Sequence, residues 1–471
     1  MTDVLIIGAG SAGSVLAERL SADERCTVTV VEWGPSATDA RVADQIADGL
    51  RLPIGPASSV VHRYPTVLTD DPRRTAQLMR GAVVGGSGAV NGGYFCRALP
   101  TDFDGWGLPG WAWADVLPHF RAIEHDLDFD TPVHGQDGPI TVRRVAVFDG
   151  ATGAFVDAAR AAGYPWVEDL NGATAGLQLP AGIGAVPLNI DGGQRVGPGG
   201  AFLQPVLGRP NLTVHTETRV QRLLLQGTRA VGVQCRGPDG ASELFADRII
   251  LCAGAIETAR LLLLSGIGPA AQVRAADVPV VADLPVGVAT IDHPEWVLPV
   301  RWTPTHGVPP LEAILTTDKG VEIRPYTAGF GAMVGGDHDD PADHPHLGIT
   351  LMRPHSRGRV RLRGTDPVIE HRYDSAPLDV LLLSEATELA RELAGAAAEG
   401  QEAVWATSQH LCGTAKMGSD DDPDAMVDNR CHVFGVDGLS IVDGSILPMA
   451  PSRGPHATIA MIGHRAAEFF A

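Results

Sequence analysis

The chain has 471 residues, of which 44% are hydrophobic and 20% are charged, a composition typical of a globular protein with two or three domains' worth of core. The formal net charge of −20 argues against binding to a nucleic-acid backbone or to an anionic membrane surface. The six cysteines form no C-x-x-C pair, so we expect neither a disulfide framework nor a metal site.

The first predicted strand begins near Val4, which leaves no room for a secretory signal. No apolar run reaches the length of a membrane-spanning helix. We therefore expect a cytoplasmic protein, and peripheral docking at the inner face of the cell membrane stays open.

The chain opens with a buried strand, a glycine turn and a helix that starts near Ser11 and Ala12. The turn contains Gly8, Gly10 and Gly13 in the spacing G-x-G-x-x-G. In such a turn the first glycine allows the tight bend, the second admits a pyrophosphate, and the third lets helix and sheet pack closely. The phosphates then lie against free N–H groups at the helix N-terminus. The pattern predicts a dinucleotide site.

A second predicted strand, residues 27–32, ends at Glu32, which lies 19 residues after Gly13. A carboxylate at this position can accept both ribose hydroxyls, and it would repel a 2′-phosphate. This argues against NADP. The glycine turn and Glu32 do not distinguish NAD from FAD as the bound dinucleotide.

Residues 80–98 form a second glycine cluster, with six glycines among nineteen residues. So many permissive backbone positions indicate a chain that lies flat against a ligand. The alternative is a flexible surface loop, but neighbours such as Val83, Val84 and Val90 are too apolar for one. We favour a loop that faces the ligand.

This cluster resembles the first signature of the glucose–methanol–choline (GMC) flavoprotein oxidoreductases, R-G-K-x-L-G-G-S-S-x-x-N. Residues 254–269 are similar to the second signature, and the likeness runs over essentially the whole chain. The resemblance implies FAD as the cofactor. Beyond the opening loop and Glu32, it implies that the cofactor is held by Arg80, Gly85, Gly86, Ser87, Asn91, Gly92, Val220, Asp443, Gly444 and Thr458.

The chain departs from the family pattern at several positions. Ala82 replaces a basic residue, Gly88 replaces the second serine, Ala259 replaces a proline or serine, and Trp33 interrupts the usual E-A-G. Some relatives tether the flavin through a histidine directly before the motif asparagine, where this chain has Val90. The departure predicts non-covalent FAD.

Two C-terminal segments, residues 408–418 and 442–463, resemble the catalytic segments of the family. His410 falls on the family's catalytic histidine, and His456 falls on its partner. With a reference pKa of about 6.5, histidine is available as a neutral base near pH 7. The resemblance implies His410 as the base and His456 as the residue that binds the developing alkoxide, and the opposite assignment stays open.

Two other groups of residues have reactive side chains. Cys412 follows His410 by two residues, but no element that would support a nucleophile accompanies it, so we interpret it as a buried structural cysteine. The acidic run of residues 419–424 lacks the glutamate of a calcium loop and is interpreted as a solvated turn.

The predicted fold class is α/β with two domains. We expect a discontinuous, Rossmann-like FAD domain from residues 1–145, 194–290 and 408–471. Residues 146–193 and 291–407 are expected to form a substrate domain on an antiparallel sheet with helices, one of them over residues 377–398. Ligand chemistry is expected where the two domains meet.

The leading hypothesis is an FAD-dependent dehydrogenase that oxidises a C–OH group. Within the family, the compact chain and the variant first signature resemble the dehydrogenase associated with mycofactocin, which implies mycofactocinol as substrate and the respiratory chain as electron acceptor. The alternatives are an oxidase that uses O₂ on a small alcohol or sugar, a lyase with structural FAD, and an FAD-binding protein without catalysis.

Overall fold

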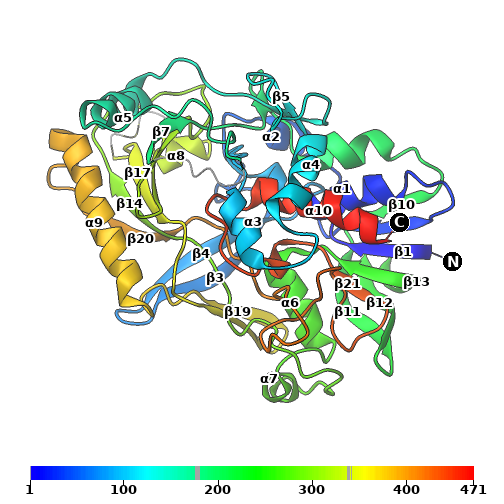
Figure 1. Ribbon diagram of the computed structural model, residues 1–471. Coiled ribbons are helices and arrows are strands. Elements are labelled where there is room, and N and C mark those ends of the chain that lie inside the picture. The colour runs from blue at the N-terminus through cyan, green and yellow to red at the C-terminus, as the bar shows by residue number, and fades with distance from the viewer. Residues whose placement is uncertain (1, 175–180, 337–339, 341, 471) are drawn as a thin grey trace.

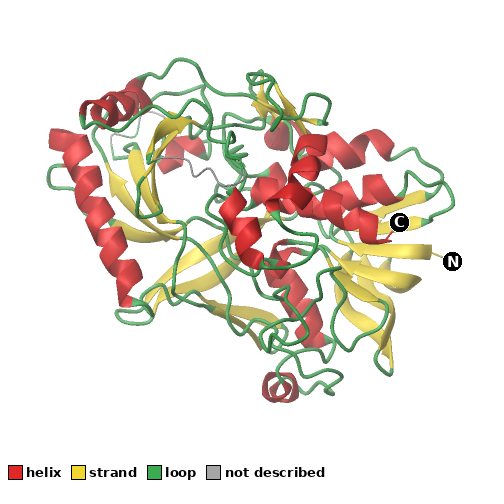
Figure 2. Ribbon diagram, in the orientation of Figure 1, coloured by secondary structure: helices red, strands yellow, loops and turns green. Residues whose placement is uncertain are grey.

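Three larger β-sheets organise the part of the chain that the computed structural model describes, which is residues 2–174, 181–336, 340 and 342–470 (Figures 1 and 2). Strand β1 lies in the middle of the first sheet, and its last four residues, Val4–Ile7, are buried. It pairs in parallel with a strand on each side. In spatial order its strands are β10 (Leu212–His215), β2 (Val28–Val31), β1 (Thr2–Ile7), β13 (Gly240–Leu251), β12 (Arg229–Gly237) and β11 (Arg219–Gln226), with β21 (Leu439–Ile441) beside β13.

Helices α1 (Ser11–Leu20) and α10 (His456–Phe470) lie side by side on this sheet, although they come from opposite ends of the chain (Figure 1). Gly463 allows the close approach, since a Cβ there would lie 2.6 Å from the Ala12 carbonyl oxygen. The contact places the first residue of α10, His456, near the glycine turn that starts α1. The fold thereby brings the C-terminal segment to the glycine turn.

The second sheet is antiparallel throughout. Helix α9 (Pro377–Ala394) covers its outer face with Leu383, Ala386 and Ala390, which pack against apolar side chains of the strands (Figure 1). This confirms the predicted helix over an antiparallel sheet. In spatial order the strands are β20 (Val404–Thr407), β14 (Pro294–Pro299), β17 (His346–Leu351), β16 (Val321–Pro325), β15 (Ala313–Thr316) and β7 (Gly182–Ala185).

The third sheet connects the two others. It pairs β18 (Arg359–Arg363) and β19 (Asp366–Glu370) with β3 (Val61–Thr69) and β4 (Arg74–Gly81), so it joins strands from both predicted domains. All strands of the first sheet come from the predicted FAD-domain segments, and all strands of the second come from the predicted substrate-domain segments. The division at these boundaries stays a proposal, and residues 175–180, 337–339 and 341 of the substrate part lie outside the described residues.

The remaining elements connect these layers. The short strands are β5 (Glu124–Asp126), β6 (Ile140–Val142), β8 (Ile190–Asp191) and β9 (Gln194–Arg195). The other helices are α2 (Ala43–Ala47), α3 (Pro100–Trp106), α4 (Trp113–Ile123), α5 (Gly150–Ala161), α6 (Gly254–Leu264), α7 (Ala270–Ala275) and α8 (Phe330–Met333). Single turns are η1 (Gly86–Ala89), η2 (Gly199–Leu203), η3 (Gln204–Val206), η4 (Gly395–Ala398) and η5 (Gly444–Ile446).

Candidate active site

A cavity of about 410 Å³ lies between the glycine turn of the first sheet and the second sheet. Its walls come from segments far apart in the sequence, which explains why no single motif reveals it. The lining includes Gly8, Gly10, Ser11, Ala12, Glu32, Arg80, Gly86, Ser87, Asn91, Gly92, Val220, Asp443, Gly444, His410 and His456. Most of the residues predicted to hold the cofactor therefore face one space.

Close backbone contacts shape the nucleotide end of the cavity. Gly8 has φ +103°, and a Cβ there would lie 2.5 Å from the Cys252 carbonyl oxygen. A Cβ at Gly13 would lie 2.0 Å from the Gly8 carbonyl oxygen, so this glycine serves helix packing and does not line the cavity. Helix α1 has no side-chain cap and no acidic residue in its first turn. Its first N–H groups are free to bind an anion.

Glu32 directly follows β2 and lines the same part of the cavity. Its carboxylate accepts the N–H groups of Ala9 at 2.9 Å and Gly34 at 2.8 Å. Burial raises its pKa, and the hydrogen bonds from these backbone N–H groups counteract that rise. Two hydrogen bonds leave further lone pairs on the carboxylate, enough for a diol such as a ribose.

The second glycine cluster is held against this turn by backbone hydrogen bonds. The Gly85 N–H donates to the Ala9 carbonyl at 2.7 Å, so Gly85 joins the two loops but does not line the cavity. Buried Arg195 donates to the carbonyl oxygens of Asn91 at 2.9 Å and Ala89 at 3.3 Å. Val90, where some relatives carry the tethering histidine, lines the cavity and offers no nucleophile.

Asp443 ties the C-terminal segment to the start of α6. Its carboxylate accepts from the Gly254 N–H at 2.8 Å, the Thr258 hydroxyl at 2.6 Å and the Ser445 N–H at 2.8 Å. The residue is buried and still lines the cavity. Its main visible contribution is to join the two segments. Thr458, predicted at the pyrimidine end, is fully buried in α10 and does not line the cavity.

His410 follows β20 and reaches the cavity from the second sheet. The preceding residue, Gln409, has φ +65°, a backbone conformation that turns the chain sharply at this point. The His410 N–H donates to Asp292 at 2.8 Å, and the His410 ring contacts His293, with 2.8 Å between the two Nδ1 atoms. Burial lowers the pKa of His410 well below its usual value, and His293, Arg324 and Arg80 lower it further. The ring is a neutral imidazole near pH 7.

His456 lines the cavity from the opposite side, as the first residue of α10. Its Nδ1 lies 3.0 Å from the Asn91 side-chain nitrogen, and its ring meets Phe95 edge-on with centroids 5.5 Å apart. Burial, assisted by Arg195, lowers its pKa to about 4. A Cβ at Gly88 would lie 2.8 Å from its Nε2, so the glycine that replaces the family serine makes room for this ring.

The far end of the cavity has aromatic walls and a cationic side. Tyr94, Tyr326, Pro310 and Leu311 line it together with Arg324. The Arg324 guanidinium donates to Glu322 at 2.7 Å, and buried Arg453 donates to the same carboxylate at 2.8 Å. Two cations therefore share the Glu322 carboxylate, and a second buried carboxylate, Glu295, lies near Arg324 and accepts from the Ser408 hydroxyl at 2.7 Å. The carboxylates among the lining residues are Glu32, Glu257 and Asp443, which belong to the nucleotide end.

Several residues of this site were not among the predicted site residues. Arg324 and Tyr326 come from an otherwise ordinary strand and its end, and no local signal marks them, whereas Tyr94 lies in the glycine cluster of residues 80–98 that was predicted to face the ligand. Asp292 and His293 stand in the D-H-P tripeptide that resembles a family landmark, so the sequence marked their position but not their role. Cys412 is buried, and burial raises the pKa of its thiol, in agreement with a structural role.

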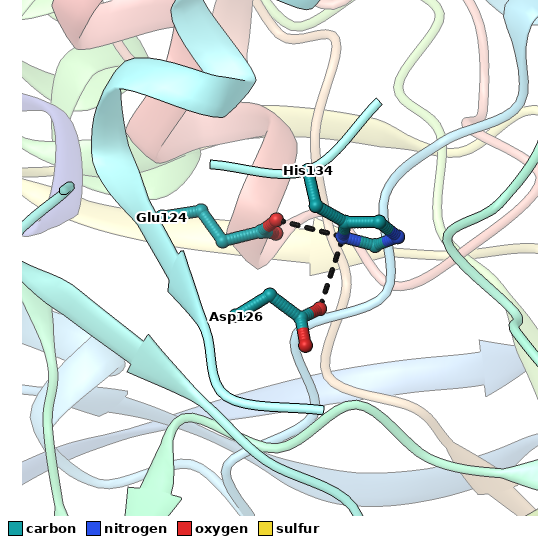
Figure 3. Close-up of side chains that lie close together, drawn as sticks. All are labelled: Glu124, Asp126 and His134. Atoms are coloured by element: carbon teal, nitrogen blue, oxygen red, sulfur yellow. Dashed lines mark hydrogen bonds and ion pairs between the residues drawn. The ribbon is translucent and has the colours of Figure 1, made fainter. Parts of the chain in front are cut away.

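A buried charge cluster next to β5 has the residue types of a metal site. The cluster consists of Glu124, Asp126 and His134, whose side chains point toward one another (Figure 3). Among the described residues, this is the group whose possible ligand atoms lie close enough together to hold a metal ion. His134 Nδ1 lies 3.0 Å from both carboxylates, and its Nε2 lies 2.7 Å from Asp169. Arg97 and Arg144 contact the same carboxylates. Both imidazole nitrogens and three carboxylates are thus engaged with three cations, and the cluster is a closed ion network.

This network predicts a pH-dependent stability. Burial opposes the charging of His134, but hydrogen bonds to Asp126, Asp169 and Glu124 outweigh it and raise the pKa to about 10. Because the folded pKa exceeds the unfolded value, the stabilisation is complete below about pH 6.5 and is lost as the pH rises through about 10. The wild type is expected to have a higher free energy of unfolding than His134→Gln at low pH. We expect this difference to shrink by about 3–5 kcal/mol as the pH rises across this range. Denaturant titrations at both ends measure it, and a gap independent of pH would contradict it.

Comparison with known proteins agrees with this architecture. Two models of the GMC oxidoreductase family match residues 2–295 and residues 354–463. An uncharacterised GMC-type oxidoreductase of Rhodococcus erythropolis is 40% identical and covers 98% of this chain and 97% of its own. An oxygen-dependent choline dehydrogenase of Brucella anthropi is 32% identical over 99% of this chain and 95% of its own. A crystal structure of pyridoxine 4-oxidase from Mesorbium loti, 28% identical, superimposes with a TM-score of 0.88 over 99% of both chains.

The chain belongs to the GMC oxidoreductase family, and it is an FAD-dependent alcohol oxidoreductase. The cavity fits this cofactor: the uncapped α1 N-terminus suits a pyrophosphate, Glu32 suits a ribose, and the close approach of Gly86 to Gly10 leaves no side chain between the loops. Within the described residues, no helix is both long and apolar enough to cross a bilayer.

Proposed function

We propose that this protein oxidises a C–OH group with His410 as the base and His456 as the hydrogen-bond donor to the substrate oxygen. The observation that carries the proposal is the convergence of two neutral imidazoles, 46 residues apart in the chain, on the cavity that contains the nucleotide cradle. A neutral base and a neutral donor on either side of one hydroxyl suit the removal of a proton from an alcohol.

Bound FAD would supply the acceptor for the hydride, with its phosphates at the α1 N-terminus and its ribose at Glu32. The residues of the chain supply the proton chemistry. His410 accepts the hydroxyl proton, and His456 stabilises the negative charge that develops on the oxygen. Tyr94, Tyr326 and Leu311 enclose the substrate and exclude water from the reacting hydroxyl.

For the substrate we propose a neutral alcohol, with mycofactocinol as the first candidate and the respiratory chain as the final acceptor at the inner face of the cell membrane. The subgroup resemblance of the first signature supports this candidate. Arg324 lines that end, but buried Glu322 and Glu295 balance its charge, so the charge of this wall does not select against a cationic alcohol such as choline.

Anaerobic mixing with candidate alcohols tests the proposed function. We expect mycofactocinol or another neutral alcohol to bleach the visible flavin absorbance, and choline serves as the cationic comparison. In air, peroxide formed at the rate of alcohol consumption would identify an oxidase. If the enzyme converts a substrate while the flavin absorbance stays unchanged, the protein is a lyase.

The attachment of FAD gives a separate prediction. Because Val90 occupies the tethering position, we expect acid precipitation of the holoenzyme to release all flavin into the supernatant. The absorbance of supernatant and pellet measures the distribution. Flavin that stays with the denatured chain would contradict the proposed non-covalent binding.

A further inference from the structure

The two histidines that line the cavity have different hydrogen-bond partners on the sides of their rings that face away from it. His410 contacts His293, and His456 contacts Asn91. Each of these partners is fixed in turn by a backbone group of known donor or acceptor character. The positions of the imidazole protons follow from these two chains of contacts.

The first chain starts at the Pro451 carbonyl. This oxygen can only accept, and it lies 3.0 Å from His293 Nε2, so that nitrogen carries a proton. His293 is 1% exposed, and burial lowers its pKa to about 4, so the ring is neutral and its Nδ1 is an acceptor. The 2.8 Å contact between the two Nδ1 atoms then requires a proton on His410 Nδ1. Since His410 is also neutral, its Nε2 carries a lone pair.

The second chain starts at the Gly93 N–H. This group donates to the Asn91 side-chain oxygen at 3.0 Å, which fixes the orientation of the amide. The Asn91 nitrogen, a donor, therefore faces His456 Nδ1 at 3.0 Å. A neutral His456 accepts at Nδ1 and carries its proton on Nε2. That nitrogen is buried beside Gly88 and has no hydrogen-bond partner of good geometry among the described residues, although the Tyr94 backbone lies near enough to the ring to raise its pKa slightly against the effect of burial.

We infer that His293 and Asn91 are positioning residues that set opposite tautomers on the two cavity histidines, so that Nε2 of His410 carries a lone pair and Nε2 of His456 carries a proton. This inference rests on the proposed function for its catalytic meaning, and it decides which histidine is the base. The Pro451 carbonyl also ends the first chain, because it cannot accept a proton covalently. A proton taken up by His410 can therefore pass no further than His293 along this chain of contacts, and it leaves again through His410 Nε2.

Two substitutions of His293 separate positioning from general structure. In His293→Asn, the side-chain oxygen can take the place of the Nδ1 acceptor and keep the His410 tautomer. In His293→Gln, the side-chain nitrogen can take the place of Nε2 and keep the bond to Pro451, while the acceptor for His410 is lost. We expect flavin reduction to stay within about tenfold of wild type in the asparagine variant and to fall about 10²–10³-fold in the glutamine variant, since a wrong tautomer removes most of a general base's effect.

Imidazole ¹⁵N spectra of histidine-labelled holoenzyme read the tautomers directly, with His410→Asn and His456→Asn variants for assignment. We expect an unprotonated Nε2 for His410 and a protonated Nε2 for His456 at neutral pH, and a protonated His410 Nε2 in His293→Gln. A protonated His410 Nε2 in the wild type, or a spectrum unchanged in His293→Gln, would overturn the inference. If the spectra are as expected but no alcohol reduces the flavin, the proposed function is rejected and the tautomer assignment stands.

Discussion

His410→Asn is expected to slow the reduction of bound flavin by substrate about 10³-fold, within the range of 10²–10⁴ that general bases contribute. Asparagine can still donate its side-chain N–H toward His293, so the packing behind the ring is kept while the lone pair that faces the cavity is removed. Stopped-flow absorbance under anaerobic conditions, at saturating substrate, measures the rate.

A matched control is available outside the cavity. His119 on α4 contacts His464 on α10, with 2.9 Å between the Nδ1 atoms, and neither residue lines the cavity. His119→Asn therefore makes the same substitution at an equivalent histidine–histidine contact, and we expect its reduction rate to stay within about twofold of wild type. A His410→Asn enzyme with full flavin content and a rate within tenfold of wild type would exclude His410 as the base.

Asp292→Ala is expected to lower the free energy of unfolding by about 3–5 kcal/mol, because it leaves several buried donors without an acceptor. The carboxylate accepts from the backbone N–H groups of His293 and His410, each at 2.8 Å. It also accepts from the hydroxyls of Tyr373 at 2.7 Å and Thr407 at 2.9 Å. One buried side chain thus joins the third sheet, the second sheet and the segment that carries the base.

Asp292→Asn serves as the comparison. The asparagine oxygen can still accept from the two backbone N–H groups, and the hydroxyls of Tyr373 and Thr407 can rotate to accept from its nitrogen. We expect a loss of about 1 kcal/mol for this variant. Guanidinium titrations followed by tryptophan fluorescence measure both. Equal losses for the two variants would show that hydrogen bonding to Asp292 does not hold this junction together.

The sequence was informative where chemistry depends on local backbone. The spacing of Gly8, Gly10 and Gly13 predicted the turn and the packing of α1, and Glu32 is at the end of β2 as expected. The helix over residues 377–398 was predicted from its apolar periodicity, and α9 forms over Pro377–Ala394 with a further single turn after it. In each case a few neighbouring residues determine the structure.

The sequence was less informative where function depends on contacts between distant segments. His293 reaches His410 across 117 residues, and Arg324 faces the cavity only because β16 lies inside the second sheet. Thr458 and Gly85 show the converse: both were predicted from the family resemblance to hold the cofactor, but neither lines the cavity. Gly88 became interpretable only when the structure placed His456 Nε2 beside it.

A crystal structure of the holoenzyme with a bound, unreactive alcohol analogue tests the central claim most directly. The account predicts the FAD pyrophosphate at the N-terminus of α1, and the analogue's hydroxyl within about 3 Å of both His410 Nε2 and His456 Nε2. An analogue bound through Arg324 with its hydroxyl away from both imidazoles, or a flavin ring outside the space between them, would contradict it.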